Sequence, residues 1–303
     1  MDGIINVYKE SGYTSHDVVA RLRGILHTKK IGHTGTLDPM AEGVLPVCVG
    51  TATKLCEMLS DHDKVYEAGM ILGKTYDTLD ITGVIQEERE VMSINSEIRE
   101  AVSAFVGGYE QTPPMYSAKK VDGKKLYDLA RRGESVVRQP VFVNIYSIEV
   151  LSVDIPHVKI LVHCGKGTYI RSLIDDIGAR LGCGAAMESL IRTKVGDFSV
   201  DESYRLSDIE AAMVSDKISD VIKPIETFFC DLKSFHADAG MSRFVRNGNV
   251  LEGKRVRSSM GLAGKIEQGT RIKVYDSEGR FSGVYEYKIS GDIFKPYKMF
   301  LSS

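Results

Sequence analysis

The chain has 303 residues, of which 43% are hydrophobic and 26% are charged. This length supports one large folded domain plus a small one, and the composition supports a proper hydrophobic core and fits a soluble protein. The first residues contain no basic segment followed by an apolar run, and no stretch approaches about 18 apolar residues. We therefore expect neither a signal peptide nor a membrane-spanning segment.

Five cysteines stand at positions 48, 56, 164, 183 and 230. Their odd number, and the absence of any Cys-x-x-Cys pair, indicate neither a disulfide framework nor a zinc site. We therefore expect small buried thiols in a reducing, cytoplasmic protein.

The formal net charge is only −2, but the charge is unevenly distributed. Residues 231–303 contain 13 Lys and Arg against 8 Asp and Glu, a charge of +5, which leaves −7 on residues 1–230. Phosphate binding depends on local positive patches rather than on the sum, so the total does not exclude a nucleic-acid partner.

The N-terminal elements are a strand and a helix. The apolar run over residues 3–8 predicts a short buried strand. Thr14 and Asp17 have the spacing of a capping box, which predicts a helix over about 15–26. Its apolar residues recur at helical spacing and indicate a face turned to the core.

Residues 31–45, IGHTGTLDPMAEGVL, present the carboxylate of Asp38 among glycines and small polar residues. Glycines let the backbone approach a ligand closely, and Pro39 forces Asp38 out of helical geometry. No acid lies between Asp17 and Asp38, whereas four Lys or Arg do. An isolated carboxylate in a positive field is typical of a nucleophile kept ionised beside a polyanionic substrate.

Two other interpretations of this loop stay open from the residues alone. The loop can be an ordinary surface turn with a solvated aspartate. Residues 32–35 also have the GxxG spacing of a KH-type RNA clamp, although the Leu-Asp-Pro sequence that follows disfavours the helix that such a clamp needs.

The next elements are strands over 43–50 and 64–72, joined by a short helix over 52–60. Tyr66 lies in the second strand, where its ring either packs in the core or faces a pocket. The loop over 73–83 carries Asp77 and Asp80 without a third acid at calcium-loop spacing, which indicates a solvated turn. An amphipathic helix is expected over 96–106.

A basic segment follows the two prolines at 113 and 114, which stop regular structure. Residues 119–138 contain seven Lys or Arg against three acids, a local charge of +4. A solvated helical face and an RNA-gripping helical arm both fit this pattern, because phosphate contacts position an RNA while a pocket reads the base. The basic side chains that would grip are those of Lys119, Lys120, Lys124, Lys125, Arg131 and Arg132.

Alternating apolar residues predict paired strands over 140–154 and 157–164, followed by a glycine-rich turn and a helix over 169–181. Arg171 falls in the first turn of that helix, where the helix dipole disfavours a cation, so it requires an anionic partner. Asp175, one turn further on, is one candidate. A helix over 207–214 ends the large unit, and residues 271–287 predict a hairpin within a separate unit that begins near residue 234.

Several of these segments together resemble one family. GHTGTLDP at 32–39, GVLPVCVGTATK at 43–54, TPPMYSAKK at 112–120 and KGTYIR at 166–171 are similar to the TruB family of tRNA pseudouridine-55 synthases. The resemblance implies an α+β fold with a central mixed or antiparallel sheet flanked by helices. It further implies a catalytic domain over 1–230, with a basic insertion near 112–140, and a small PUA-like RNA-binding domain over 231–303.

The resemblance also implies a reaction: isomerisation of uridine 55 in the T-loop of tRNA by base flipping, without cofactor or metal, in a monomeric enzyme. Asp38 corresponds to the nucleophile, Arg171 to the arginine paired with it, and Tyr66 to a tyrosine that stacks on the uracil. Such a pairing lowers a carboxylate pKa by about 1–3 units, so we expect Asp38 to be ionised. The expected substrate-binding residues are His33, Tyr169, Leu190 and Lys9.

Two positions depart from the family pattern, since Lys9 is followed by Glu10 where proline is usual, and Ile191 replaces a usual arginine. Two other classes of function compete, an RNA-binding protein without catalysis and an aspartate-dependent hydrolase such as a glycosidase. A glycosidase needs two carboxylates across a cleft, and no second acid stands out near Asp38 in the sequence.

Overall fold

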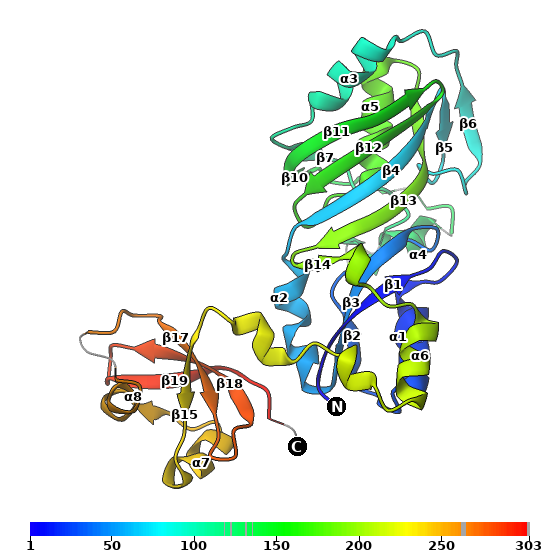
Figure 1. Ribbon diagram of the computed structural model, residues 1–303. Coiled ribbons are helices and arrows are strands. Elements are labelled where there is room, and N and C mark those ends of the chain that lie inside the picture. The colour runs from blue at the N-terminus through cyan, green and yellow to red at the C-terminus, as the bar shows by residue number, and fades with distance from the viewer. Residues whose placement is uncertain (118, 122, 131, 135, 262–264, 302–303) are drawn as a thin grey trace.

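The computed structural model describes residues 1–117, 119–121, 123–130, 132–134, 136–261 and 265–301. Figure 1 shows a large body built on a central sheet and a smaller β-rich body formed by the last part of the chain. The predicted α+β class, with a mixed sheet flanked by helices, is confirmed.

Within the described ranges, eight strands form the sheet of the large body. Six of them lie in the order β1–β3–β13–β4–β12–β11, and neighbours are antiparallel except for the parallel pair β3 and β13. β2 also pairs with β3, and β14 with β13. The strands are β1 (Gly3–Lys9), β2 (Ile31–His33), β3 (Glu42–Val49), β4 (Lys64–Leu72), β11 (Ile145–Asp154), β12 (His157–Cys164), β13 (Ala185–Val195) and β14 (Phe198–Ser199).

Both faces of β1 and β3 are covered. Alternate side chains of a strand point to opposite faces, and here one set packs with α1 (Ser15–Ile25) and α6 (Leu206–Val214). The other set packs with the 3₁₀ turn η1 (Gly50–Leu55) and with α2 (Cys56–Ser60). This double cover explains why both strands are apolar runs rather than alternating sequences.

β12 is covered on one face. Val158, Ile160 and Val162 are buried in a core shared with α3 (Asn95–Ser103) and α5 (Ile170–Leu181), whereas the residues between them are wholly or partly exposed. Figure 1 shows α5 behind the upper half of the sheet and α3 at its upper end, beside β11. The alternation of apolar and polar residues in the sequence of β12 therefore arises because helices cover only one face of the sheet here.

The capping box predicted for the first helix is present. The N–H of Asp17 donates to Thr14 Oγ1 at 3.1 Å, and the N–H of Thr14 donates to Asp17 Oδ2 at 2.8 Å. These bonds satisfy backbone donors at the start of α1, which ends one residue before the predicted limit.

Two predictions in the connecting segments need correction. The expected loop over 73–83 begins a hairpin of β5 (Lys74–Tyr76) and β6 (Ile85–Glu88). The expected helical arm is instead a small hairpin, β8 (Lys120–Val121) with β9 (Lys124–Lys125), followed by α4 (Leu126–Ala130). Gly123, at φ +79°, makes the hairpin turn, a conformation that glycine adopts without strain. The base of this arm is a second pair of strands, β7 (Tyr109–Gln111) and β10 (Val141–Val143).

The smaller body has its own sheet in the order β15–β17–β18–β19–β16, and the predicted hairpin is its β17–β18 pair. Phe281, Val284 and Phe300 pack with Phe229 of the large body, so the two bodies share apolar contacts. The elements are β15 (Lys233–His236), α7 (Ala239–Arg246), β16 (Leu251–Glu252), α8 (Gly253–Ser259), β17 (Arg271–Tyr275), β18 (Phe281–Lys288) and β19 (Ile293–Met299). The 3₁₀ turns η2 (Val200–Glu202), η3 (Ile218–Asp220) and η4 (Ile225–Phe229) occur in the part of the chain between β14 and β15.

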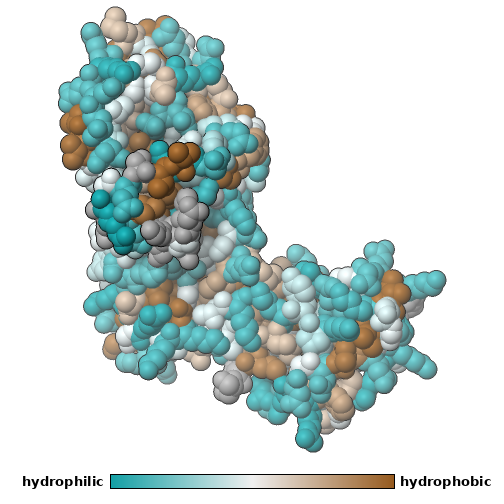
Figure 2. All heavy atoms as spheres, turned by 180° about the vertical axis from the view of Figure 1, so that it is seen from behind, coloured by the Kyte–Doolittle hydropathy of each residue, from teal (hydrophilic) through white to brown (hydrophobic). Residues whose placement is uncertain are grey.

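None of the helices in the described ranges has the length and apolar character needed to cross a membrane. On the face seen in Figure 2, hydrophilic residues predominate and the hydrophobic ones form small separate patches. The five cysteines, all within the described ranges, are free thiols.

Candidate active site

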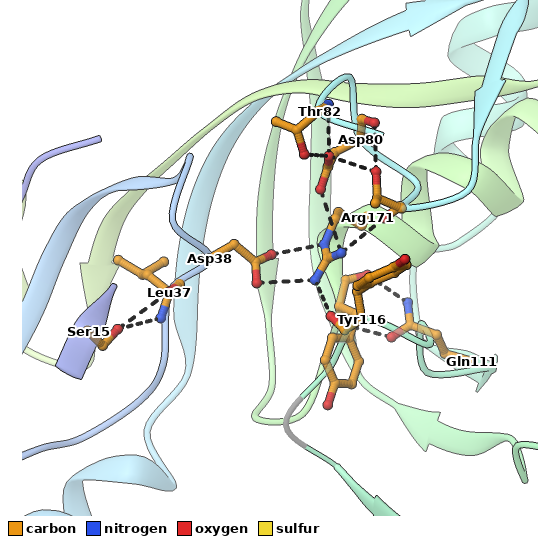
Figure 3. Close-up of polar contacts among 10 residues, drawn as sticks. Ser15, Leu37, Asp38, Asp80, Thr82, Gln111, Tyr116 and Arg171 are labelled. Atoms are coloured by element: carbon orange, nitrogen blue, oxygen red, sulfur yellow. Dashed lines mark hydrogen bonds and ion pairs between the residues drawn. The ribbon is translucent and has the colours of Figure 1, made fainter. Parts of the chain in front are cut away.

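Asp38 lies in the loop between β2 and β3, and this loop is held through its backbone. The N–H of Leu37 donates to the hydroxyl of Ser15, the first residue of α1, at 2.9 Å (Figure 3). At Gly43 the φ angle is +101°, and a Cβ would lie 2.3 Å from the carbonyl oxygen of Arg192. Only glycine permits β3 to approach β13 this closely, so Gly43 sets where the loop ends.

Two buried cations hold the same loop from the side of the sheet. Arg192, on β13, donates through Nε to the carbonyl of Val44 at 2.7 Å and through Nη2 to the carbonyl of Gly35 at 3.2 Å. Lys9, at the end of β1, donates through Nζ to the carbonyls of Ala41 at 2.5 Å and Pro39 at 3.1 Å. These bonds fix the backbone on both sides of Asp38 and leave its carboxylate free for another partner.

The position of Lys9 in the structure therefore differs from the role that the resemblance implied for it. The side chain was expected to bind substrate, but it is fully buried beneath the loop. Burial lowers the pKa of Lys9 from 10.5 to about 8. Its observed contacts support the loop.

We predict a pH signature for Lys9→Met, because the folded and unfolded chains hold the Lys9 proton differently. Between about pH 8 and pH 10.5 the folded chain releases this proton while the unfolded chain keeps it, so the free energy of unfolding rises with pH. Wild type should gain up to about 3 kcal/mol over Lys9→Met across that range. Urea unfolding of both proteins at several pH values measures the difference. The prediction would be contradicted if the free energies of unfolding of the two proteins changed equally with pH.

Arg171 faces Asp38 from the first turn of α5. Its Nε lies 2.9 Å from Asp38 Oδ2, and its Nη2 lies 3.1 Å from Oδ1, a two-point ion pair (Figure 3). Arg171 is 5% exposed. The contact expected between these two residues is present, and Asp175 is not the partner that the structure gives Arg171.

Asp80 was expected in a solvated turn, although the family resemblance implies that its segment, Asp-Thr-x-Asp at 77–80, lies near the active-site loop. It is 4% exposed rather than solvated, and its Oδ2 lies 3.6 Å from Arg171 Nη1, so the guanidinium stands between two carboxylates (Figure 3). Asp80 Oδ1 accepts hydrogen bonds from Thr78 Oγ1 at 2.9 Å and from the N–H of Thr82 at 3.0 Å. The prediction of a solvated turn holds for Asp77, which is exposed, and is wrong for Asp80, which is a second acid near Asp38. The two threonines that flank Asp80 were the available signal for a closed turn.

The pKa of Asp38 also differs from the expectation. Burial raises the pKa of Asp38 above 3.8, and this effect is larger than the lowering by Arg171. The negative charge of Asp80 raises it further, because both acids share one guanidinium. The expected net lowering is therefore wrong.

A pocket of about 470 Å³ opens beside the ion pair. Asp38 and Arg171 line it together with Tyr66 from β4, Tyr169 at the start of α5 and Leu190 from β13. These five residues come from distant parts of the sequence, and the structure brings them around one cavity. Burial raises the pKa of Tyr66, so its phenol is kept neutral at neutral pH.

His33 lies outside the lining of this pocket, beside its entrance loop. Its Nδ1 accepts a hydrogen bond from the N–H of Gly35 at 3.3 Å, and its ring meets that of His16 edge-on at 5.5 Å. Burial lowers the pKa of His33 below 6.5, so the ring is neutral at neutral pH.

The basic arm lies between β7 and β10. Lys120, Lys124 and Lys125 belong to its hairpin, and Lys119 precedes it. Arg132 is exposed in the turn after α4, and Arg131 lies outside the described residues. Among the residues that the structure describes, no group of three or more His, Cys, Asp or Glu could hold a metal ion.

Comparison with known proteins decides the family. The model of the TruB family pseudouridylate synthase N-terminal domain matches residues 23–170, and that of the tRNA pseudouridylate synthase B C-terminal domain matches 171–229. The tRNA pseudouridine synthase B of Lachnoclostridium phytofermentans is 47% identical, over 99% of this chain and 100% of that protein. The chain belongs to the TruB family.

Other relatives agree with this assignment. The tRNA pseudouridine synthase B of Clostridium acetobutylicum is 43% identical over 94% of this chain and 95% of its own length. A chain in the structure of an H/ACA RNP bound to a substrate RNA containing 2'-deoxyuridine superposes with a TM-score of 0.70. It is 26% identical, and the match covers 99% of this chain and 85% of that one. This TruB-family chain is a pseudouridine synthase, an isomerase with a pseudouridine-synthase fold.

Sequence reasoning gave Arg192 no role in this TruB-family site, and from the residues alone it expected Asp80 in a solvated turn. Arg192 is 2% exposed and follows Ile191, the residue that replaces a usual arginine. An arginine in a strand that reads as buried was the available signal, because an arginine is almost never fully buried without partners.

Proposed function

We propose that this enzyme converts uridine 55 in the T-loop of tRNA to pseudouridine, with Asp38 as the nucleophile. The observation that carries the proposal is the two-point ion pair of Asp38 and Arg171, which lines a pocket with Tyr66, Tyr169 and Leu190. Relatives named tRNA pseudouridine synthase B support tRNA as the substrate.

The pocket suits a base taken out of its stack. Extracting a base costs a few kcal/mol, and stacking on an aromatic ring returns roughly 1–3 kcal/mol. Tyr66 and Tyr169 offer such rings, and Leu190 offers an apolar contact. Neutral His33 would assist by hydrogen bonding or stacking in the disrupted loop, since without charge it cannot pair with a phosphate.

The reaction breaks the bond between ribose C1′ and uracil N1 and forms a bond between C1′ and uracil C5. The hydrogen of C5 leaves as a proton, and N1 takes up a proton. Asp38 can begin this sequence by attack at C1′, by attack at uracil C6, or by removal of the 2′ proton. Arg171 holds the carboxylate in one orientation, because its planar fork binds both oxygens. The exchange of bonds involves no net oxidation or reduction.

The remainder of the chain would bind the rest of the tRNA. Lys119, Lys120, Lys124, Lys125, Arg131 and Arg132 would contact phosphates and set the register of the T-arm. We propose residues 1–230 as the catalytic domain and residues 231–303, with their charge of +5, as a PUA-like RNA-binding domain. The enzyme would act as a cytoplasmic monomer.

Tritium release from tRNA labelled at uridine C5 tests the proposal. A synthase releases about one tritium per reacted uridine, because C5 loses its hydrogen when it bonds to C1′. A U55C transcript should release none. If the protein bound tRNA without releasing tritium, it would be an RNA-binding protein without catalysis. If it released free uracil, it would be a hydrolase. The geometry disfavours the hydrolase, since Asp80 is buried against Arg171 and does not line the pocket.

A further inference from the structure

Gln111, at the end of β7, holds the peptide that begins α5. It is 1% exposed, its Oε1 accepts the N–H of Tyr169 at 2.8 Å, and its Nε2 donates to the carbonyl of Tyr169 at 3.0 Å (Figure 3). Only one orientation of the amide satisfies both bonds, because the oxygen accepts and the nitrogen donates.

This contact supplies a partner at the start of α5 from outside the helix. Tyr169 is the N-cap residue of α5, and its own side chain makes no capping bond. The first N–H groups of a helix lack partners within the helix, so Gln111 satisfies one of them from a different element. The same Tyr169 carbonyl also accepts the N–H of Leu173 at 3.0 Å, the first bond of the helix.

The bond network continues in both directions from Gln111. Its Nε2 also donates to the hydroxyl of Tyr109 at 2.7 Å, and that hydroxyl donates to Asp176 on α5 at 2.7 Å. Beyond Gln111, the carbonyl of Thr112 accepts the hydroxyl of Ser172 at 2.9 Å. The segment that leads into the basic arm is therefore bonded along the first two turns of α5.

The first turn of α5, which Gln111 holds, carries two residues of the active site. Tyr169 lines the pocket, and Arg171 lies two residues further on, where Nη2 donates to the carbonyl of Tyr116 at 2.8 Å. A displacement of this turn would move the ring and the guanidinium together. Misplacement of reacting groups by about 1 Å can reduce a rate by about 10²-fold.

We propose that Gln111 is a positioning residue for pseudouridine formation, which it serves by clamping the Tyr169 peptide and so aiming Tyr169 and Arg171 at the bound uridine. The inference rests on the proposed function. Gln111 does not line the pocket, and its effect passes through α5.

Two substitutions test the clamp in the full-length protein. Gln111→Met keeps the length of the side chain and removes all three bonds. Gln111→Glu keeps the acceptor, and it restores one donor only while the carboxyl is protonated. We expect Gln111→Met to lower the single-turnover rate of tritium release at least about tenfold, with tRNA affinity within about twofold of wild type.

The pH profile of Gln111→Glu provides the readout that a purely structural role would not give. Burial raises the pKa of a carboxyl, so the new acid should donate to the Tyr169 carbonyl at about pH 6 and lose that proton by about pH 8.5. The rate relative to wild type should therefore fall at least about tenfold over this range. Tyr109 and Asp176 belong to the same network and Asp175 lies beside them, so the pH profile of Gln111→Met, which lacks the new acid, is measured over the same range to separate their titration from that of the new carboxyl.

Glu110→Gln is the matched control, because Glu110 lies on the same strand and is exposed. Its rate should equal that of wild type. Normal single-turnover rates and a wild-type pH profile in the Gln111 variants would overturn the inference, as would a loss of thermal stability without a loss of rate. If Gln111→Met does not fold, the profile of Gln111→Glu decides. Failure of the proposed function is separate, since it would appear as no tritium release by the wild-type protein, or as tritium release by Asp38→Asn.

Discussion

Asp38→Asn should abolish turnover while the protein still folds and binds tRNA. The amide keeps the size of the side chain but lacks the charge that reacts, so we expect a loss of at least about 10⁴-fold in the tritium release rate. The fold should persist because Lys9 and Arg192 hold backbone carbonyls of the loop rather than the Asp38 carboxylate. Single-turnover tritium release, filter binding of tRNA and thermal melting measure the three properties.

Asp77→Asn is the matched control for Asp38→Asn. Asp77 is exposed, and its Oδ1 accepts the N–H of Val84, a bond that asparagine can also accept. The same loss of one negative charge should therefore leave the rate unchanged. Substantial activity in Asp38→Asn would reject the proposed nucleophile.

The substitution Arg171→Lys should also strongly lower the rate of tritium release. Arg171 bonds both oxygens of Asp38, the carbonyls of Thr78 and Tyr116, and approaches Asp80. Lysine is a point charge without the planar fork and cannot make these contacts together. We expect the rate to fall roughly 10²–10³-fold, because the carboxylate loses its orientation.

The same substitution should move the pH dependence of the residual activity. Weaker pairing raises the pKa of Asp38 further, so the activity that needs the carboxylate should appear at higher pH than in wild type. Arg180→Lys, at the exposed end of the same helix, is the control and should match wild type. Near-normal kinetics of Arg171→Lys would contradict the role of the pair.

Several regular elements were predictable from local pattern, whereas the central strand β13 was not predicted. The limits of β4 and β12 agree with the predicted strands, because apolar or alternating runs there end at turn residues. The arm was mispredicted as helical, because charge spacing does not distinguish a helix from a hairpin. In the structure, the positive φ angle of Gly123 forms the turn of a hairpin instead.

The residues of the candidate site also differ in how well the sequence predicted them. Asp38 and Arg171 carry local signals, an acid before proline in a glycine-rich loop and a cation at a helix start, and the family resemblance paired them. Asp80 carries a weaker signal, because its burial depends on the docking of its turn against β13, where the N–H of Ile81 donates to the carbonyl of Met187. No spacing within residues 73–83 encodes that contact.

The sequence alone determined several elements, such as β4 and β12, the family resemblance and the acid–guanidinium pair, because these depend on residues a few positions apart or on long matching segments. Only the tertiary structure decided that two carboxylates share Arg171, that Lys9 and Arg192 support the loop, and that burial raises the pKa of Asp38. Each of these depends on which distant side chains exclude water from one another, a property of the folded sheet and its covering elements rather than of any one segment.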